Sequence, residues 1–416
     1  MRTNITQVNP KIIVVICFSC SYFAFYGKLP SRCMKHPSVR SEANQPLQST
    51  QTTDAVVIGA GAVGCAVALR LAQHGIIPHV IERDDIAANA SGYAWGGLSA
   101  HFGSGVPGPM TKHYREAIDK HVEHYERVSR EPEFDWQLQR VISMSLADNE
   151  KSATDLAEEV EWMRSEGFKA ELISPDNIYE IEPAVRPGMI AASLVNAGWE
   201  LDSYAYTRSL ADECERYGAT FSNGTATSVS TAGGKITSVN LNDQTCIETP
   251  LVVAATGPWV NQIKGIPELP IKPIKGEIIR LEREGNDLQH RVGFGGFNVG
   301  RKPDGSVWAG TYEWDRGFNR DVTEEGRNHI MNGVTHYIPS LAGLRTIKTT
   351  ACLRPVASDG LPIVGASNAV DGLYYVNGAG KKGILLSLLM AEWLIGQVTH
   401  SIAPPVIVSP SRFGDM

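Results

Sequence analysis

Residues 55–64 read AVVIGAGAVG, and this stretch decides the fold of the chain. Its first four residues form a short continuous apolar run, which is typical of a buried parallel strand. The G-x-G-x-x-G pattern that follows predicts a tight turn into a helix, and helical spacing continues to Gly75. A second strand is expected over 78–81 and ends at Glu82. This order of strand, glycine turn, helix, strand and acidic residue predicts a Rossmann-like unit that binds a dinucleotide.

Each glycine of the pattern has a physical role. Gly59 allows the tight turn, Gly61 lets the backbone approach a pyrophosphate, and Gly64 lets the helix pack closely on the strand. The helix N-terminus offers unpaired N–H groups and a positive dipole end to the phosphates. Glu82 is placed to accept hydrogen bonds from the ribose hydroxyls, which argues against the 2′-phosphate of NADP. The pattern by itself leaves NAD and FAD open.

Composition excludes several classes of protein. The chain has 416 residues, enough for two domains of ordinary size, and its 43% hydrophobic and 20% charged residues are typical of soluble globular proteins. The net charge of −7 and the lack of a long basic run argue against nucleic acid as a partner. Seven scattered cysteines predict no disulfide framework. His121 and His124 are expected on a solvated helix face, and no metal site is predicted.

Residues 1–51 are expected to lie outside the fold, as a leader. Residues 12–26 are apolar and flanked by Lys11 and Lys28, and the first acidic residue of the chain is Glu42. The run is shorter than the ~20 residues of a spanning helix, and it suits a signal-peptide core, a membrane anchor or an organelle transit peptide. Because the lack of acidic residues favours import, we expect a mitochondrial location, with membrane anchoring or another organelle as the alternative.

Blocks further along the chain resemble those of one family, in the family's order. The small residues ASG at 90–92 and GGL at 96–98 resemble a loop that lies against phosphate and the flavin ring edge. LVVAATG at 251–257 resembles the strand beneath the adenosine half of FAD. The closing signature is matched by CLRP at 352–355, SDGLPIVG at 358–365 and NGAGKKGILL at 377–386. From about 54 to 397 the chain resembles the D-amino-acid oxidase superfamily, in the branch of glycine oxidase, sarcosine oxidase and D-amino-acid dehydrogenase.

The resemblance implies FAD and an α/β fold, in which a Rossmann-like FAD-binding domain is interleaved with an α+β substrate domain on a mostly antiparallel sheet. The FAD-binding domain is expected over 52–110, 195–265 and 345–405, the substrate domain over 111–194 and 266–344, and a tail over 406–416. The residues implied in FAD binding are Gly59, Gly61, Gly64, Glu82, Ser91, Gly96, Gly97, Leu98, Gly257, Gly378, Gly380, Gly383 and Ile384. Cys352 stands where some relatives attach flavin through a thioether, with a small buried strand residue as the alternative.

The resemblance also implies a reaction, the oxidation of the CH–NH bond of a small amino acid or N-methyl amino acid by hydride transfer to flavin N5. Arg354 presents a planar fork that matches the substrate carboxylate, with a structural ion pair as the alternative interpretation. Lys381 and Lys382 are the other candidates for this carboxylate.

Ala379 replaces a family histidine in the loop that holds Lys381 and Lys382. Two other departures bear on the electron acceptor, because Asn298 replaces a tyrosine and Trp308 stands in place of a lysine used for oxygen activation. The acceptor is therefore left open between oxygen and an electron carrier. Two other functions stay open as well: a 2-hydroxy-acid dehydrogenase of the same superfamily, and a flavoprotein assembly factor for a respiratory complex.

Overall fold

The computed structural model describes residues 50–282 and 288–414. Most of the predicted leader therefore lies outside the described residues. Its last two positions, Thr50 and Gln51, belong to strand β1 (Thr50–Thr52), which pairs in parallel with β11 (Cys246–Glu248). The backbone of these two residues, which the prediction assigned to the leader, completes the hydrogen bonding of a sheet edge.

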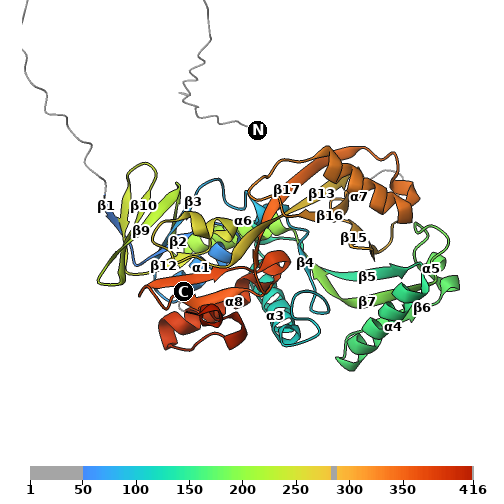
Figure 1. The fold of residues 1–416 in the computed structure, drawn as a ribbon, viewed down its shortest axis with the longest axis horizontal. Helices are drawn as coiled ribbons and strands as arrows, with labels where there is room; N and C mark the ends of the chain where they lie inside the picture. The colour runs from blue at the N-terminus through green and yellow to red at the C-terminus, as the bar shows by residue number, and fades with distance from the viewer. Residues whose placement is uncertain (1–49, 283–287, 415–416) are drawn as a thin grey trace, which may run out of the picture. The chain divides into compact units, whose positions relative to one another are not determined.

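The glycine-rich turn follows a strand of a six-stranded sheet, of which Figure 1 labels β2, β3 and β12. Its central strand is β2 (Ala55–Ile58), whose four side chains are all buried because both faces of the sheet are covered. The strand order is β18-β19-β12-β2-β3-β8, and only the β18–β19 pair is antiparallel. The other strands are β3 (Pro78–Glu82), β8 (Thr220–Asn223), β12 (Val252–Ala254), β18 (Ile363–Ala366) and β19 (Leu373–Asn377).

Different layers cover the two faces of this sheet. One face packs against α1 (Ala62–Gln73), α6 (Ser203–Arg216) and α8 (Gly383–His400), which share one hydrophobic core. On the other face lies a four-stranded sheet of order β1-β11-β10-β9, in which β9 is Ala226–Ala232 and β10 is Lys235–Leu241. This arrangement confirms the predicted Rossmann-like layer structure.

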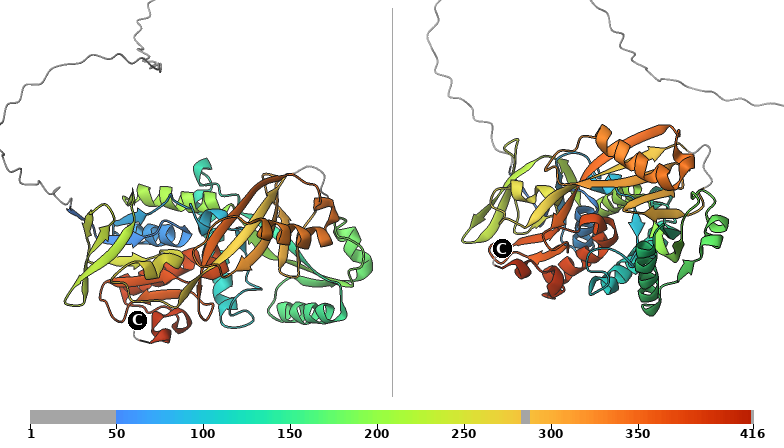
Figure 2. Two further views of the ribbon diagram at one scale, coloured as in Figure 1. Left: turned by 45° about the horizontal axis from the view of Figure 1, so that its top comes forward. Right: turned by 45° about the vertical axis from the view of Figure 1, so that its right-hand side comes forward.

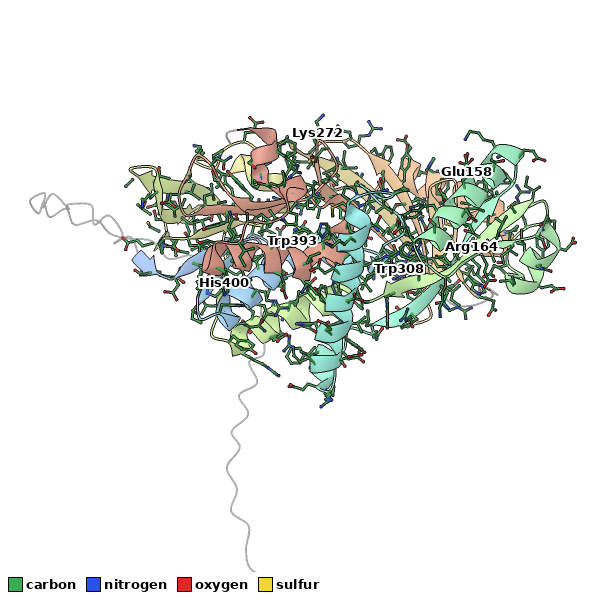
Figure 3. All side chains as sticks on the ribbon, turned by 90° about the horizontal axis from the view of Figure 1, so that it is seen from below. Glu158, Arg164, Lys272, Trp308, Trp393 and His400 are labelled. Atoms are coloured by element: carbon green, nitrogen blue, oxygen red, sulfur yellow. The ribbon has the colours of Figure 1, made fainter. Side chains whose placement is uncertain are left out.

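Helix α3 (Met110–Val128) packs in the same core as α8. The ring of His113 meets the ring of Trp393, a residue of α8 labelled in Figure 3, edge-to-face at 5.2 Å between centroids. The predicted boundary at 111 assigns this helix to the substrate domain, whereas its apolar side chains share a core with the dinucleotide-binding elements.

We expected His121 and His124 to lie on a solvated face of this helix, and this expectation is wrong. His121 is fully buried, and its Nε2 donates to the carbonyl oxygens of Ile384 and Leu385 at 3.0 Å. His124 is buried too, and its Nε2 lies 3.2 Å from a carboxylate oxygen of Glu213 on α6. Both side chains face neighbouring helices, because α3 is covered by α6 and α8.

A second large sheet, mostly antiparallel as predicted, carries the substrate end of the molecule. Its order is β17-β13-β16-β15-β14-β5-β7-β4, with β6 paired to β7, and only β14 and β5 run parallel. Figure 2 shows the long strands β13 and β17 in both views. The strands are β4 (Gly97–Leu98), β5 (Gln139–Ala147), β6 (Ala170–Ile173), β7 (Ala191–Glu200), β13 (Ile271–Leu281), β14 (Arg291–Phe294), β15 (Phe297–Arg301), β16 (Val307–Trp314) and β17 (Thr346–Ala357).

Local side-chain caps explain where several helices begin. Asn149 and Ser152 form a reciprocal capping box at the start of α4 (Glu150–Ser165), and Thr323 caps α7 (Glu324–Tyr337) by accepting from the Gly326 N–H. The remaining helical segments are α2 (Ala90–Tyr93), α5 (Pro175–Ile181), η1 (Pro132–Phe134), η2 (Gly257–Gln262), η3 (Pro339–Leu341), η4 (Gly380–Lys382), η5 (Val406–Val408) and η6 (Pro410–Phe413).

By length and composition, the stretch Gly380–His400 could cross a membrane. More than half of it is buried, and α8 packs between α1 and α3 in the hydrophobic core. An apolar helix with this environment is a core helix.

Candidate functional site

One cavity of about 1120 Å³ joins the glycine-rich turn to the second sheet. It begins at the carboxyl end of β2, beside Gly59 and Glu82, and reaches Arg354 on β17. This volume exceeds the ~300–1,000 Å³ of ordinary small-molecule sites, and it suits a dinucleotide together with a small substrate.

The cofactor end has the geometry that phosphate and ribose binding require. Gly59 has φ +107, a conformation that strongly favours glycine, and Gly61 is the N-cap of α1. A Cβ on Gly64 would overlap the carbonyl oxygen of Gly59, so this glycine permits the close helix–strand packing without lining the cavity. The Oγ of Ser91 accepts from the Ala62 N–H at 2.9 Å, directly after the turn.

Glu82 lies at the end of β3, as predicted, and lines the cavity. Its carboxylate accepts from the Ala60 N–H at 2.8 Å and the Asp84 N–H at 2.9 Å. These backbone donors fix the carboxylate at the cavity wall, where its free lone pairs can accept from ribose hydroxyls.

The remaining predicted FAD residues divide into lining and supporting groups. The cavity wall includes Ser91, Gly96, Gly97, Gly257, Gly378, Gly380, Gly383 and Ile384. Leu98 is fully buried in the core and does not line the wall. The wall also holds Thr256, whose buried Oγ1 has no partner among the described residues. The unpaired hydroxyl, the uncovered start of α8 and the glycine-lined wall fit a bound FAD.

The substrate end is organised around Glu313, which no sequence motif had marked. Its Oε1 accepts from Arg354 Nη1 at 2.6 Å and from Lys381 Nζ at 2.7 Å. Burial opposes ionisation, but the charges of Arg354 and Lys381 outweigh it and hold the pKa of Glu313 below its ordinary value. Gly276 on β13 makes room for this arrangement, because a Cβ there would lie 2.5 Å from Arg354 Nη2.

The two neighbouring lysines do not face the same side. Lys381 joins Arg354 at Glu313 and is 63% exposed, whereas Lys382 is 6% exposed and donates to the Ser99 carbonyl oxygen at 3.0 Å. Lys382 Nζ lies 4.0 Å from the centroid of the Phe102 ring. Burial, together with the charges of Arg291 and Lys381, lowers the pKa of Lys382 to about 7. The structure therefore brings Arg354 and Lys381 together and places Lys382 apart from them.

Cys352 is buried on β17 and lines the cavity. Burial raises the pKa of its thiol above the ordinary value, and the opposing charge of Arg354 does not reverse this. A raised thiol pKa lowers the thiolate fraction, which favours the interpretation of Cys352 as a strand residue. The covalent link to flavin stays a prediction.

The sequence analysis missed several residues of the cavity wall, among them the charged residues Glu313 and Arg291. A register shift between Glu277 and Ile278 changes the pairing of β13 with β16, so simple alternation along β16 does not show which side chains face the cavity. Arg291 had one available signal, a cation that opens the apolar run of β14.

A doubly covered parallel sheet, a glycine turn at its carboxyl edge and a second sheet over the cavity define a dinucleotide-binding oxidoreductase fold. The family of FAD dependent oxidoreductases named DAO matches residues 54–397, and the chain belongs to this family. The protein is thus an FAD-dependent oxidoreductase, which confirms the predicted cofactor and family.

Individual relatives differ in what their names describe. The chain is 23% identical to the hydrogen cyanide synthase subunit HcnC of Pseudomonas aeruginosa, over 86% of this chain and 95% of that protein. It is 26% identical to one subunit of the anaerobic glycerol-3-phosphate dehydrogenase of Escherichia coli, over 85% of this chain and 68% of that protein. The glycine oxidase structure from Geobacillus kaustophilus has a TM-score of 0.80 at 20% identity, covering 88% of this chain and 99% of that one. These similarities support the fold and leave the substrate open.

Proposed function

We propose that this protein oxidises the CH–NH bond of a small amino acid or N-methyl amino acid, producing an imine that water then hydrolyses. Bound FAD supplies the hydride acceptor for this chemistry. The observation that carries the proposal is the pair of cations, Arg354 and Lys381, which converge on one carboxylate at the cavity wall.

The cation pair is suited to hold a substrate carboxylate. Glu313 engages Nη1 of Arg354, and the guanidinium keeps other N–H groups for a second carboxylate. Two cations beside one anion leave a net positive charge, which attracts a carboxylate and disfavours an ammonium group. The chain would thus bind the acid group of the substrate and favour the neutral amine, the form from which a hydride leaves readily.

The proposal is tested by anaerobic reduction of the purified holoprotein. Glycine, sarcosine and D-amino acids are each added without oxygen, and the flavin absorption band is followed. Bleaching by an amine supports the proposal. If every amine and hydroxy acid fails although FAD is bound, amine oxidation is refuted and the assembly-factor function becomes the leading alternative.

Oxidation of a 2-hydroxy acid is the second candidate, because the same cations would hold its acid group. The relative named as part of a glycerol-3-phosphate dehydrogenase favours including hydroxy compounds in the panel. Bleaching by lactate, with none by amines, would support this candidate, whereas bleaching by glycerol 3-phosphate alone would indicate a hydroxy phosphate ester as the substrate. Reoxidation of the bleached protein by air or by a quinone would then identify the acceptor.

A further inference from the structure

Two cations in the cavity wall, Arg291 and Lys382, are not explained by a single substrate carboxylate. Both line the cavity, and neither pairs with a carboxylate among the residues that the structure describes. The Arg291 guanidinium lies 5.0 Å from the centroid of the Trp95 ring, and a Cβ on Gly97 would lie 2.7 Å from its Nη1. Its fork therefore has aromatic and backbone neighbours, and among the described residues it forms no direct ion pair, although the charge of Glu200 reaches it.

The charges at this end of the cavity do not balance. The acidic side chains of the wall are Glu82, at the ribose end, and Glu313, which is taken up by Arg354 and Lys381. Arg291 and Lys382 therefore add positive charge that no described neighbour in the wall offsets. Glu200 does not line the wall but its charge acts on Arg291, and it is already engaged by Lys302 at 2.9 Å and by Trp95 Nε1 at 2.6 Å. Buried cations without an anionic partner are costly unless a ligand supplies the counter-charge.

The pyrophosphate of FAD is not that counter-charge. Its cradle is the turn at Gly59 and the N-terminus of α1, whereas Arg291 lies beyond Gly97 and Lys382 lies against Phe102. Lys381 and Lys382 are consecutive residues of η4 with different partners, one at Glu313 and one at Ser99. An anion bound at Lys382 and an anion bound at Arg354 would therefore lie on opposite sides of η4.

We infer that the cavity takes a substrate with two carboxylates, one held at Arg354 and Lys381 and the second held by Arg291 and Lys382. The inference rests on the proposed function for the first carboxylate and extends it to the class of acidic or N-carboxymethyl amino acids. Arg291 and Lys382 are then the residues that determine specificity.

Binding without turnover gives the first test. The flavin absorption of the holoprotein is titrated with acetate and propionate, and with succinate and glutarate. A dicarboxylate should bind at least about 30-fold more tightly than the matched monocarboxylate, the effect expected for a desolvated charge pair. Arg291→Gln and Lys382→Met should each remove most of this preference while acetate binding stays within about threefold. Arg291→Lys, which keeps the charge, should retain part of it.

Arg280→Gln is the matched control. Arg280 is a cation of the same sheet that stacks on Trp308 at 4.1 Å and does not line the cavity. This variant should keep the dicarboxylate preference. Equal binding of mono- and dicarboxylates by the unaltered protein would overturn the inference. It would also be overturned if Arg291→Gln shifted the reduction potential of the bound flavin and left dicarboxylate affinity unchanged.

Turnover separates the inference from the function on which it rests. Aspartate, glutamate and iminodiacetate should bleach the flavin at lower concentrations than alanine or glycine. If the monocarboxylic amines bleach it equally well, the inference fails and the proposed function stands. If no amine bleaches it but dicarboxylates still bind preferentially, the proposed function fails and the second anion site stands. Tighter binding of a phosphate ester than of a carboxylate of equal length would overturn the choice of carboxylate.

Discussion

At the scale of single residues, the wall of the cavity depends on glycines, which have no side chain, as much as on charged residues. Gly64 brings α1 against the turn after β2, and Gly276 lets the Arg354 guanidinium lie across β13. The glycine motif predicts Gly64, because its contact with the backbone of Gly59 can accept only glycine, whereas nothing in the sequence analysis predicted the role of Gly276. Sequence motifs could not predict Glu313, because its role depends on which side chains reach it from β17 and η4.

Gly64→Ala is expected to abolish FAD binding and to destabilise the fold. The added Cβ would overlap the Gly59 carbonyl oxygen, so the helix must move away from the turn. Gly61→Val should also abolish FAD binding but leave the fold largely intact, because its Cβ would meet the Ser91 Oγ at 3.0 Å and then the phosphate site. FAD content per chain and thermal melting measure the two effects. Recovery of fully loaded yellow protein from either variant would contradict the assigned cradle.

Arg354→Leu should lower the affinity for a carboxylate substrate or inhibitor by two orders of magnitude or more. Removing one partner of a buried charge pair costs about 3–5 kcal/mol, and each ~1.4 kcal/mol is tenfold in affinity. Arg354→Lys should restore only part of the loss, since an ammonium lacks the planar fork. Acetate titration of the bound flavin is the measurement. Unchanged affinity together with loss of FAD would show that Arg354 is structural.

Glu313→Gln should act in the opposite direction. The amide keeps hydrogen-bonding capacity but removes the negative charge that offsets Arg354 and Lys381. A bound carboxylate then meets two cations without a competing anion, so the same titration should show tighter binding. Weaker binding in this variant would mean that Glu313 orients Arg354 and does not compete with the substrate.

At the scale of elements, α8 connects the cavity to the core. Its first turn lines the cavity at Gly383 and Ile384, and the rest of the helix packs between α1 and α3. His121 of α3 donates to two carbonyls of that first turn, and Tyr206 of α6 bonds Ser387 Oγ at 2.7 Å. The start of α8 is therefore held by buried polar contacts from two other helices.

The burial of His121 predicts a pH dependence of stability. Burial lowers its pKa to about 4, from an ordinary value of 6.5, so the unfolded chain binds more protons between these two pH values. Stability should therefore fall as the pH falls from 6.5 towards 4, by up to about 3 kcal/mol from this group, at ~1.36 kcal/mol per unit. The nearby charged groups His124, Arg127 and Glu213 add their own dependence.

Thermal melting of His121→Gln at pH 7 and pH 4.5 tests this effect. Glutamine can still donate a hydrogen bond but does not titrate, so the loss of Tm on acidification should be smaller than in the unaltered protein. His74→Gln, which changes an exposed histidine, serves as the control and should leave the loss unchanged. An equal loss in His121→Gln would show that other groups dominate acid sensitivity.

At the scale of the whole molecule, much of the fold could be predicted from the sequence. The strand–turn–helix–strand order around Gly59 and Glu82 follows from apolar runs, glycines and one acid at fixed spacing. The burial of His121 and the membership of α3 in the cofactor core could not be predicted, because both depend on α8, more than 250 residues further along the chain. The charge excess at Arg291 and Lys382 likewise exists only once distant segments meet.

Residues 1–49 are expected to be dispensable for FAD binding and to direct the protein to mitochondria or to a membrane. A truncated chain that begins at Thr50 keeps β1 and its pairing with β11, so it should retain full FAD content. A fluorescent protein fused to residues 1–49 should colocalise with mitochondria or membranes. A diffuse cytosolic signal would refute the targeting role, and loss of FAD on truncation would refute the dispensability.

The parallel sheet gathers its middle strands from three distant places, β2 near residue 55, β12 near 252 and β19 near 373. During synthesis β2 must therefore wait for β12, and then for β19 and the start of α8, which are made later still. Until then the nascent chain carries open strand edges and half a nucleotide cradle, a state prone to aggregation that chaperones would have to shield. FAD can lock the structure only after β19 and the start of α8 have been made. A ribosome stalled before residue 373 should thus hold a chain that binds no flavin.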